Sequence, residues 1–222
     1  MKATFFDANG VLYFRVHGQR FFQAFLQELG LQMPDVHTLK VATAEIHDQA
    51  LRGQVSNNDY FNAVLRFCGV TNPSLMVHGR AALDRDHGDI QLFGGVKETL
   101  VELKTRGFKL GIVTDAAVPK AKKLEWFEAN GLNIYWDAYA NSMDLGVRKP
   151  DRAMYQEALS QAGVFGGETV FVGHDRRELE GAKAVGLMTI AFNYDREARA
   201  DFYIEDFPEL INLPFLQQAD IE

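Results

Sequence analysis

The chain has 222 residues, of which 47% are hydrophobic and 24% charged, a composition typical of a globular protein with a substantial core. Its net charge of -7 gives no support to nucleic-acid binding, which needs a basic surface. Cys68 is the only cysteine, so an intramolecular disulfide is excluded. No apolar run approaches the ~20 residues of a membrane span, and no secretory signal precedes the first strand pattern, so we expect a cytoplasmic protein.

Short, continuously apolar runs predict strands buried on both faces, as in a parallel sheet. These runs cover residues 3–6, 109–113, 169–172 and 188–192. Apolar residues at helical spacing predict helices over residues 95–107, 120–132 and 151–163. Strand and helix alternate from about residue 92 onward, which predicts an α/β doubly wound fold with a parallel sheet.

Residues 14–91 break this alternation. They contain no convincing strand pattern but four helical stretches, over residues 20–30, 35–53, 56–69 and 73–88. The sequence therefore predicts an all-helical insertion after the first strand. The expected division is an α/β core domain formed by residues 1–13 and 92–222, and a helical domain over residues 14–91.

Polar residues follow the carboxyl ends of the predicted strands, where open α/β sheets bind their ligands. They are Asp7, Asn9 and Gly10 after the first strand, Thr114 and Asp115 after the second, Lys149 in the loop GVRKPD, and His174, Asp175 and Glu178 in the segment FVGHDRRELEGA. A carboxylate, a hydroxyl, a lysine and an acidic loop together indicate a site that handles an anion.

The residue types suggest a mechanism. A carboxylate at a rigid strand end, here Asp7, can attack an electrophile in line and give an acyl intermediate that water hydrolyses. If the electrophile is phosphorus, Lys149, the Thr114 hydroxyl and backbone N–H groups of the loop after Asp7 would stabilise the developing charge. We expect the substrate to contact Gly10, Thr114, Asp115 and Lys149.

A divalent cation would help two anions to approach each other. Its expected ligands are Asp7, the backbone carbonyl of Asn9 and an acid of the last loop, Asp175 or Glu178. Magnesium fits, because it binds a few oxygen ligands and keeps some of its waters.

The motifs resemble those of the haloacid dehalogenase-like (HAD) hydrolase superfamily over nearly the whole chain. The similar segments are TFFDANG, LFGGVKETLVELKTRGFKLGIVTD, MDLGVRKPDRAMY and VFVGHDRRELEGAKAVGLMTIAFN, in the order of the four motifs of the family. The resemblance implies a Rossmann-like core with an inserted α-helical cap that closes over the site. It also implies a Mg²⁺-dependent phosphatase that acts on a small phosphorylated metabolite through an aspartyl-phosphate at Asp7.

Two positions depart from the pattern of the family. Phosphatases of this kind usually carry a second aspartate two residues after the nucleophile as general acid and base, but Asn9 stands there and has no ionisable proton. Turnover of esters with poor leaving groups should therefore be slow. His174 stands where the last motif often has its first acid, which predicts weaker metal binding. The sequence does not decide whether Asp175 or Glu178 faces the metal.

Three functions remain open from the sequence. The phosphatase leads, with catalytic roles for Asp7, Asn9, Thr114 and Lys149. Asn9 and the weakened metal loop also suit a metal-independent dehalogenase-like hydrolase that attacks carbon, although Thr114-Asp115 is not the Ser-Asn pair of dehalogenases. The third is a HAD fold retained for ligand binding. The substrate is expected to be small and anionic, whereas its identity and the oligomeric state are not readable.

Basic residues outside the motifs have less specific roles. Arg15 and Arg20, near the start of the insertion, are candidates for contacting an anionic substrate, and Arg176 and Arg177 for replacing part of the charge of the metal. Lys120, Lys122 and Lys123 open a predicted helix, where we expect them to form a solvated face.

Overall fold

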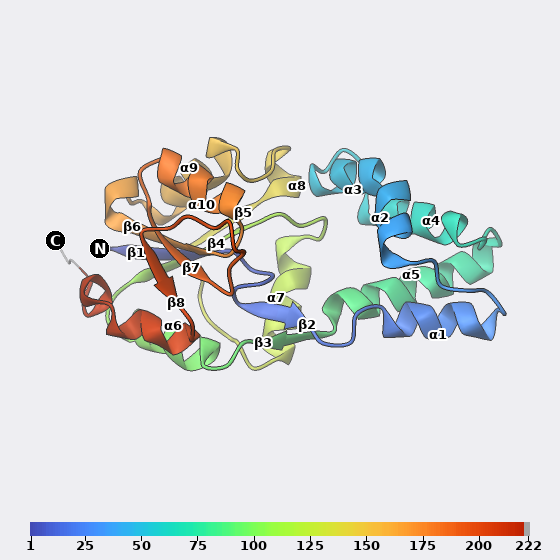
Figure 1. Cartoon of the computed structure of the whole chain (residues 1–222), viewed down its shortest axis with the longest axis horizontal. Helices are drawn as coiled ribbons and strands as arrows, with labels where there is room; N and C mark the ends of the chain where they lie inside the picture. Colours follow the sequence, from blue (N-terminus) through green and yellow to red (C-terminus); the bar gives the residue numbers. More distant parts are fainter. Residues whose placement is uncertain (220–222) are drawn as a thin grey trace.

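A six-stranded parallel sheet forms the centre of the larger part of the protein in the computed structural model, which describes residues 1–219 (Figure 1). In order across the sheet, the strands are β5 (Ala138–Asn141), β4 (Lys109–Thr114), β1 (Ala3–Phe6), β6 (Thr169–Gly173), β7 (Met188–Phe192) and β8 (Phe202–Ile204). The chain starts in the middle, at β1, and the later strands extend the sheet on either side. The strand order therefore reverses at β1, and this is where such sheets bind ligands.

Helices cover both faces of the sheet, which confirms the predicted doubly wound fold. The larger helices are α9 (Arg152–Ala162) and α10 (Arg176–Ala184) on one face, and α6 (Val96–Thr105) and α7 (Lys120–Ala129) on the other. Short helices complete the core: α8 (Ser142–Leu145), η1 (Gly166–Glu168), η2 (Phe207–Asn212) and η3 (Pro214–Leu216).

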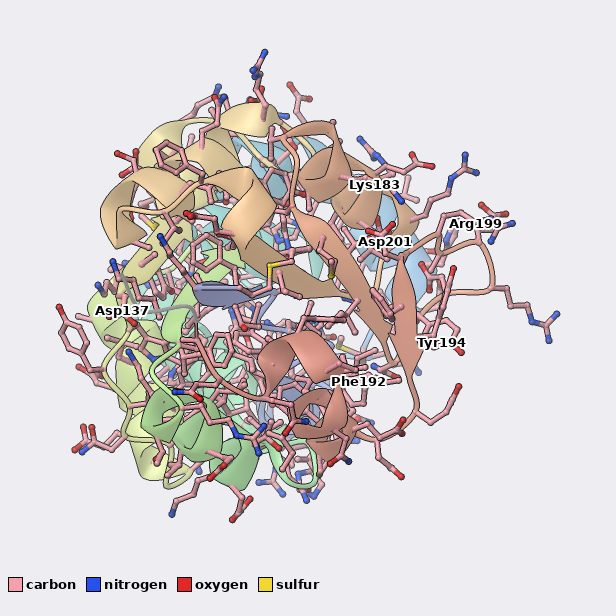
Figure 2. All side chains as sticks on the ribbon, turned by 90° about the vertical axis from the view of Figure 1, so that its left-hand side faces the viewer. Asp137, Lys183, Phe192, Tyr194, Arg199 and Asp201 are labelled. Carbon is pink, nitrogen blue, oxygen red and sulfur yellow. The ribbon has the colours of Figure 1, made fainter. Side chains whose placement is uncertain are left out.

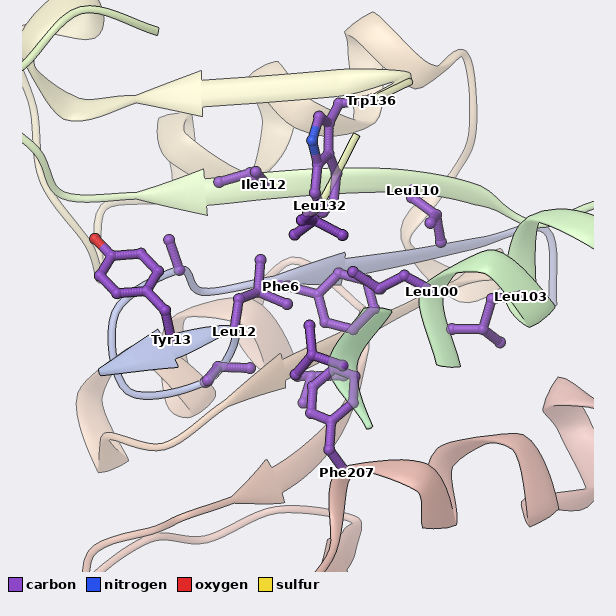
Figure 3. Packing of buried hydrophobic residues seen from close by; sticks show 14 of the residues in the cluster. Phe6, Leu12, Tyr13, Leu100, Leu103, Leu110, Ile112, Leu132, Trp136 and Phe207 are labelled. Carbon is purple, nitrogen blue, oxygen red and sulfur yellow. The ribbon is translucent and has the colours of Figure 1, made fainter. Parts of the chain in front are cut away.

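Alternate side chains of the strands build the two halves of the core, because successive residues of a strand point to opposite faces. Phe5 packs with the side chains of α9 and α10. Phe6 and Ile112 point to the other face, where Phe207 of η2 lies against Phe6 (Figure 3). This packing fixes β1 between two apolar layers and makes its carboxyl end a rigid support.

A helical insertion follows β1, as predicted. Its helices are α1 (Arg20–Glu28), α2 (Val36–Ala42), α3 (Ala44–Leu51), α4 (Asn57–Phe67) and α5 (Pro73–Gly88). They form a separate apolar core that includes Phe22, Leu26 and Phe61. Within residues 1–219, no helix combines the length and the apolar character that crossing a membrane requires.

The predicted helix over residues 35–53 is in fact two helices. Thr43 separates α2 from α3, with φ -112° and ψ 7°. Its hydroxyl donates a hydrogen bond of 2.8 Å to the carbonyl of Leu39. Such side-chain bonds to the preceding turn favour a bend over a straight helix.

The expectation that residues 14–91 contain no strand is also wrong. Strand β2 (Tyr13–Arg15) pairs antiparallel with β3 (Ile90–Leu92), where the chain enters and leaves the insertion. Three-residue strands are too short for apolar alternation to reveal them. In Figure 1 this ribbon lies between the sheet and helices α1 and α5. We propose that the boundary between the core domain (1–13 and 92–222) and the cap domain (14–91) runs through it.

Strands β5 and β8 were not among the predicted strands. Strand β8 has two exposed residues and lies at the edge of the sheet. Asp201 secures it, because its carboxylate accepts hydrogen bonds from the backbone N–H and the hydroxyl of Thr189 on β7, at 3.0 and 2.9 Å. Asp201 also pairs with Lys183 of α10 (Figure 2). These contacts join residues that are distant in the sequence, so no local sequence pattern predicts this strand.

Candidate active site

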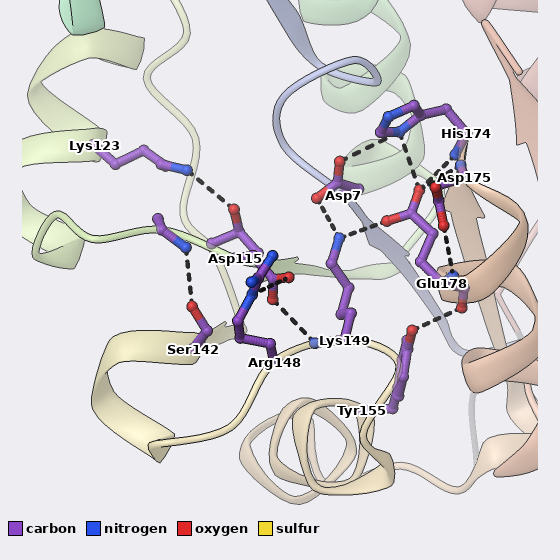
Figure 4. A network of polar contacts seen from close by, with 12 residues as sticks. Asp7, Asp115, Lys123, Ser142, Arg148, Lys149, Tyr155, His174, Asp175 and Glu178 are labelled. Carbon is purple, nitrogen blue, oxygen red and sulfur yellow. Dashed lines mark hydrogen bonds and ion pairs between the residues drawn. The ribbon is translucent and has the colours of Figure 1, made fainter. Parts of the chain in front are cut away.

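The carboxyl ends of β1, β4 and β6 bring the predicted site residues together (Figure 4). Asp7 follows β1, Thr114 ends β4 and His174 follows β6. The backbone N–H of Asp7 donates to the carbonyl of Val172 at 3.0 Å, so Asp7 continues the hydrogen-bond ladder of the sheet by one residue. The backbone that carries its carboxylate is therefore held by the sheet itself.

Lys149 joins two buried carboxylates. Its Nζ donates to Oδ1 of Asp7 at 2.5 Å and to Oε2 of Glu178 at 2.6 Å. Burial would lower the pKa of Lys149, but Asp7, Glu178 and Asp115 outweigh burial and raise its pKa above the ordinary value. The lysine is therefore a fixed positive charge at the end of β1.

The two carboxylates differ in how well they are stabilised. Burial raises the pKa of Asp7, and Lys149 offsets this only in part. Burial would also raise the pKa of Glu178, but Lys149, His174 and backbone N–H donors hold it well below its usual range. Those backbone donors are the N–H groups of His174 and Asp175, which bond Oε1 at 2.7 and 2.9 Å. Asp7 is thus the less firmly stabilised anion of the pair.

His174 faces both carboxylates. Its Nδ1 lies 3.0 Å from Oε1 of Glu178 and 3.5 Å from Oδ2 of Asp7, yet it has no aligned hydrogen-bond partner among residues 1–219. The adjacent Glu178, and Asp7 to a lesser extent, raise the pKa of His174. Gly10 makes room for the imidazole: its φ is +91°, and a Cβ there would lie 3.0 Å from the ring.

The two candidate acids of the last loop have different positions. Asp175 caps α10, because its carboxylate accepts from the backbone N–H groups of Arg177 and Glu178 at 2.8 and 3.3 Å. Glu178 instead faces Asp7. Within residues 1–219, possible ligand atoms of Asp7, His174 and Glu178 lie within 4.8 Å of one another. Metal roles for Asp7, Asn9, Asp175 and Glu178 stay predictions.

The spacing of these atoms suits a shared cation. Ligands about 2.1 Å from a metal are separated by about 3.0 Å in octahedral and about 3.4 Å in tetrahedral geometry. The separations of 3.0 and 3.5 Å from Nδ1 of His174 are close to this range, so one cation could reach all three side chains. Once His174 is deprotonated, the lone pair of Nδ1 faces both carboxylates, so the residues present fit a divalent cation.

Thr114 is buried beside a second lysine that the motifs did not reveal. Nζ of Lys123, on α7, donates to Oγ1 of Thr114 at 3.0 Å. The expectation that Lys123 lies on a solvated face is wrong, because only 2% of the residue is exposed. The signal was in the periodicity: Trp126 and Phe127, three and four residues later, are buried on the same helix. Burial lowers the pKa of Lys123 to about 8.

We expect Lys123→Met to raise the melting temperature. At pH 7 Lys123 is protonated in the folded and the unfolded chain, so the folded state bears the full cost of burying the charge. Between pH 8 and 10.5 the unfolded chain binds more protons, so the free energy of unfolding of the wild type rises. Calorimetry should show the variant about 2–4 °C higher at pH 7, with a smaller difference at pH 9.5.

Lys122→Met is the matched control for this measurement. Lys122 precedes Lys123 on α7, is partly exposed and pairs with Asp84 at 3.2 Å. Such a surface pair contributes little to stability, so the melting temperature should stay nearly constant. A lower melting temperature for Lys123→Met at pH 7 would contradict the account.

Asp115 organises the loop that carries Lys149. Its carboxylate accepts from the backbone N–H of Lys149 at 3.1 Å and from Nε of Arg148 at 3.3 Å. Arg148 also donates to Asp48 of α3 at 2.5 Å, so it links the edge of the sheet to the helical insertion. The predicted contact between Asp115 and the substrate stays a prediction.

Two neighbouring cavities open at this edge. The first, of about 290 Å³, is lined by residues that include Asp7, Asn9, Thr114, Lys149 and Arg177. The second, of about 310 Å³, lies between the sheet edge and the insertion, and its lining includes Arg15 and Lys123. Asn9, Asp115 and Arg148 line both cavities, so the two adjoin.

The candidate arginines have different surroundings. Arg15 lines the second cavity, whereas Arg20 pairs with Asp89 at 3.2 Å. Arg176 pairs with Glu180 on the surface of α10, while Arg177 reaches the first cavity. The sequence also gave no indication that His47 and His87 line the second cavity. Burial lowers the pKa of both, to about 3 for His87, so they are neutral at pH 7.

A known protein family matches most of the chain. Residues 21–192 match the family described as haloacid dehalogenase-like hydrolase. The chain belongs to this family. The match begins after Asp7, so it does not itself assign a role to the first motif.

Relatives and solved structures agree with this family. The chain is 29% identical over 124 residues to a glyceraldehyde 3-phosphate phosphatase of Methanocaldococcus jannaschii, covering 52% of this chain and 53% of that protein. It is 28% identical over 141 residues to a phosphoglycolate phosphatase of Yersinia pestis, covering 59% and 60%. The match thus spans little more than half of either relative.

The fold is that of solved HAD structures. The putative HAD-hydrolase YfnB from Bacillus subtilis, solved bound to magnesium, superposes with a TM-score of 0.72. The superposition covers 96% of this chain and 97% of that chain at 18% identity. At this identity the likeness concerns the fold alone.

Proposed function

We propose that the protein is a metal-dependent phosphatase of small phosphorylated metabolites, with Asp7 as the nucleophile. The observation that carries the proposal is the buried contact of Lys149 with both Asp7 and Glu178, beside Thr114. It supplies a carboxylate at a rigid strand end and a permanent cation where a phosphoryl group would lie. Two relatives with phosphatase names, each matched over little more than half its length, support it further.

In the proposed reaction, the Asp7 carboxylate attacks the phosphorus atom in line. A bond forms between the carboxylate oxygen and phosphorus, the bond from phosphorus to the ester oxygen breaks, and the leaving alkoxide takes up a proton from water. Water then attacks the phosphorus of the aspartyl-phosphate, which releases phosphate and regenerates Asp7. Lys149 donates to the phosphoryl oxygens in both steps.

Lys123 orients the hydroxyl group of Thr114 so that it can donate a hydrogen bond to the phosphoryl group. An ammonium group only donates hydrogen bonds, so Oγ1 of Thr114 accepts from Lys123 and its own O–H stays available. That hydroxyl then donates to a phosphoryl oxygen. The backbone N–H groups of the loop after Asp7, including Gly10, supply further donors.

We propose that Asp7, His174 and Glu178 hold a divalent cation, together with the backbone carbonyl of Asn9. The cation would compensate the charge of the phosphoryl oxygens as the nucleophile approaches. Magnesium is the first candidate, since the related B. subtilis protein was solved with it. The imidazole of His174 weakens this choice, because magnesium prefers oxygen ligands and nitrogen suits transition metals.

Replacing the imidazole of His174 with a carboxylate should raise the affinity of the site for magnesium. We expect His174→Asp to bind Mg²⁺ on the order of tenfold more tightly than the wild type, because it adds a charged oxygen ligand. Titration calorimetry with MgCl₂ measures this directly, without turnover. His37→Asp, the same change at an exposed position of the insertion, should leave the affinity unchanged. Equal or weaker binding in His174→Asp would rule out His174 as a ligand.

Phosphate release from an activated aryl phosphate tests the function. Such a leaving group needs little protonation, so Asn9 should not mask the activity. We expect turnover with Mg²⁺ or Mn²⁺ and its loss with a chelator. Phosphoglycolate and glyceraldehyde 3-phosphate, named for the relatives, are the first metabolites to test. Absence of phosphate release under every condition would overturn the proposal, and turnover that survives the chelator would overturn its metal.

Asn9 favours one alternative, hydrolysis at carbon. It lines the cavity beside Asp7 and offers no ionisable proton, and displacement of a halide needs none. The test is chloride release from a panel of 2-haloacids, for which our proposal predicts no activity. Chloride release that is lost in Asp7→Asn would establish the alternative.

A further inference from the structure

We propose that the cavity between the helical insertion and the sheet edge binds a second anionic group of the substrate, at Lys123 and Arg15. The preferred substrates are then small phosphomonoesters that carry an anionic tail. This inference rests on the proposed phosphatase function, because it assumes that the phosphoryl group lies at Asp7.

The arrangement of the two cavities directs the tail of the substrate toward Lys123 and Arg15. The phosphoryl site and the second cavity share Asn9, Asp115 and Arg148 in their linings. A substrate with its phosphorus beside Asp7 therefore extends past Asn9 into the second cavity. With a volume of about 310 Å³, this cavity has room for a short tail and some water.

The charges of this lining do not balance. Arg15, Lys123 and Arg148 are cations, and Asp115 is the one carboxylate among the described lining residues. Asp115 already accepts from Arg148 and from the backbone of Lys149. His47 and His87 are neutral at pH 7. Among the described residues, Lys123 and Arg15 thus remain without a carboxylate in direct contact.

Lys123 shows the imbalance most clearly. It is 2% exposed, and its hydrogen-bond partner within residues 1–219 is the neutral hydroxyl of Thr114. Its Nζ also lies 5.8 Å from the centre of the Tyr13 ring. A buried ammonium without a carboxylate is costly, and an anion from the substrate would compensate it.

Arg15 supplies the second cation from β2. Its side chain forms no ion pair with a described carboxylate, and it is close enough to lower the pKa of Lys123, His47 and His87. Arginine binds carboxylate and phosphate groups through two parallel N–H donors. An anionic tail therefore finds one donor from the core helix α7 and another from the ribbon that leads into the insertion.

Binding of phosphonates that cannot be hydrolysed tests the subsite without turnover. Phosphonoacetate carries a carboxylate tail, and 2-hydroxyethylphosphonate carries a neutral tail of similar length. In calorimetry with saturating Mg²⁺ we expect the wild-type protein to bind phosphonoacetate at least ~10-fold more tightly. Methylenediphosphonate serves as a third ligand: tighter binding than phosphonoacetate assigns the subsite to a phosphate tail, and weaker binding to a carboxylate tail.

Variants assign the preference to residues. Lys123→Met and Arg15→Gln should each bring the affinity ratio of phosphonoacetate to 2-hydroxyethylphosphonate toward one. Arg15→Gln should change the affinity for the neutral ligand little, whereas Lys123→Met also removes the partner of Thr114, so for this variant the ratio is the readout. Lys122→Met removes the same charge from the neighbouring, partly exposed position on α7 and should keep the ratio. Arg15 is exposed, so Arg15→Gln tests the subsite even if Lys123→Met alters the fold.

The results separate this inference from the proposed function. Equal binding of the two ligands by the wild type, a ratio that survives both variants, or no phosphonate binding at all would overturn the subsite. If phosphatase activity holds, equal kcat/KM for phosphoglycolate and ethyl phosphate would overturn it too. A clear preference for phosphonoacetate without phosphate release from any ester would support the anion subsite and reject the phosphatase.

Discussion

Asp7→Asn should lower phosphate release from an activated aryl phosphate by ~10³-fold or more, because it removes the nucleophile. The amide keeps the size of the side chain and can still accept from Lys149, so the fold should be retained. Burial disfavours the charged form of Asp7, and the neutral side chain is therefore tolerated there. Steady-state phosphate release, measured with and without metal, gives the rates.

Asp151→Asn is the matched control for this prediction. Asp151 is exposed, caps α9 through the backbone N–H of Ala153 at 2.9 Å and lies two residues beyond Lys149. Asparagine caps helices about as well as aspartate, so activity should stay within about twofold. Activity in Asp7→Asn close to that of the wild type, with an unchanged melting temperature, would exclude Asp7 as the nucleophile.

Asn9→Asp should raise turnover of alkyl phosphates by ~10² to 10⁴-fold, the usual effect of a general acid and base. Asn9 lines both cavities, so a carboxyl group there would reach the leaving oxygen and later the attacking water. Turnover of an activated aryl phosphate should rise much less, because that leaving group departs without a proton. The comparison of the two esters separates proton transfer from a general gain in activity.

Asn57→Asp provides the comparison for Asn9→Asp. Asn57 lines the second cavity, so the variant adds the same charge near the substrate but away from Asp7. It should not produce the selective gain for alkyl phosphates. An equal gain for both esters in Asn9→Asp, or no gain at all, would show that protonation of the leaving group does not limit the proposed reaction.

The larger elements of the fold were predictable because buried strands and helices have characteristic patterns of apolar residues. Continuous apolar runs predicted β1, β4, β6 and β7, and the periodic spacing of apolar residues predicted the long helices. The ribbon of β2 and β3 and the edge strand β8 have only three residues each. What defines them is pairing and tertiary contacts such as those of Asp201, which no short window of sequence contains.

The central residues of the site were predictable from their positions after the strands, since the carboxyl ends of parallel strands lie at one edge of the sheet. The structure brings Asp7, Thr114, Lys149 and Glu178 to that edge as expected. Lys123 does not lie on a solvated face, because its spacing to Trp126 and Phe127 places it on the buried face of α7. Arg15 was a candidate from its place near the start of the insertion. The cavity that it lines depends on how the insertion lies over the sheet, and sequence periodicity does not carry that information.

The central claim, a phosphoryl group carried by Asp7, is tested most directly by trapping it. Asn9 cannot activate water, so the aspartyl-phosphate should break down slowly and accumulate with an activated aryl phosphate. Acid quenching during turnover, digestion and mass spectrometry should find one phosphoryl group on the peptide that contains Asp7, and none in Asp7→Asn. Steady phosphate release with no modified peptide, or with the label on another residue, would contradict the account.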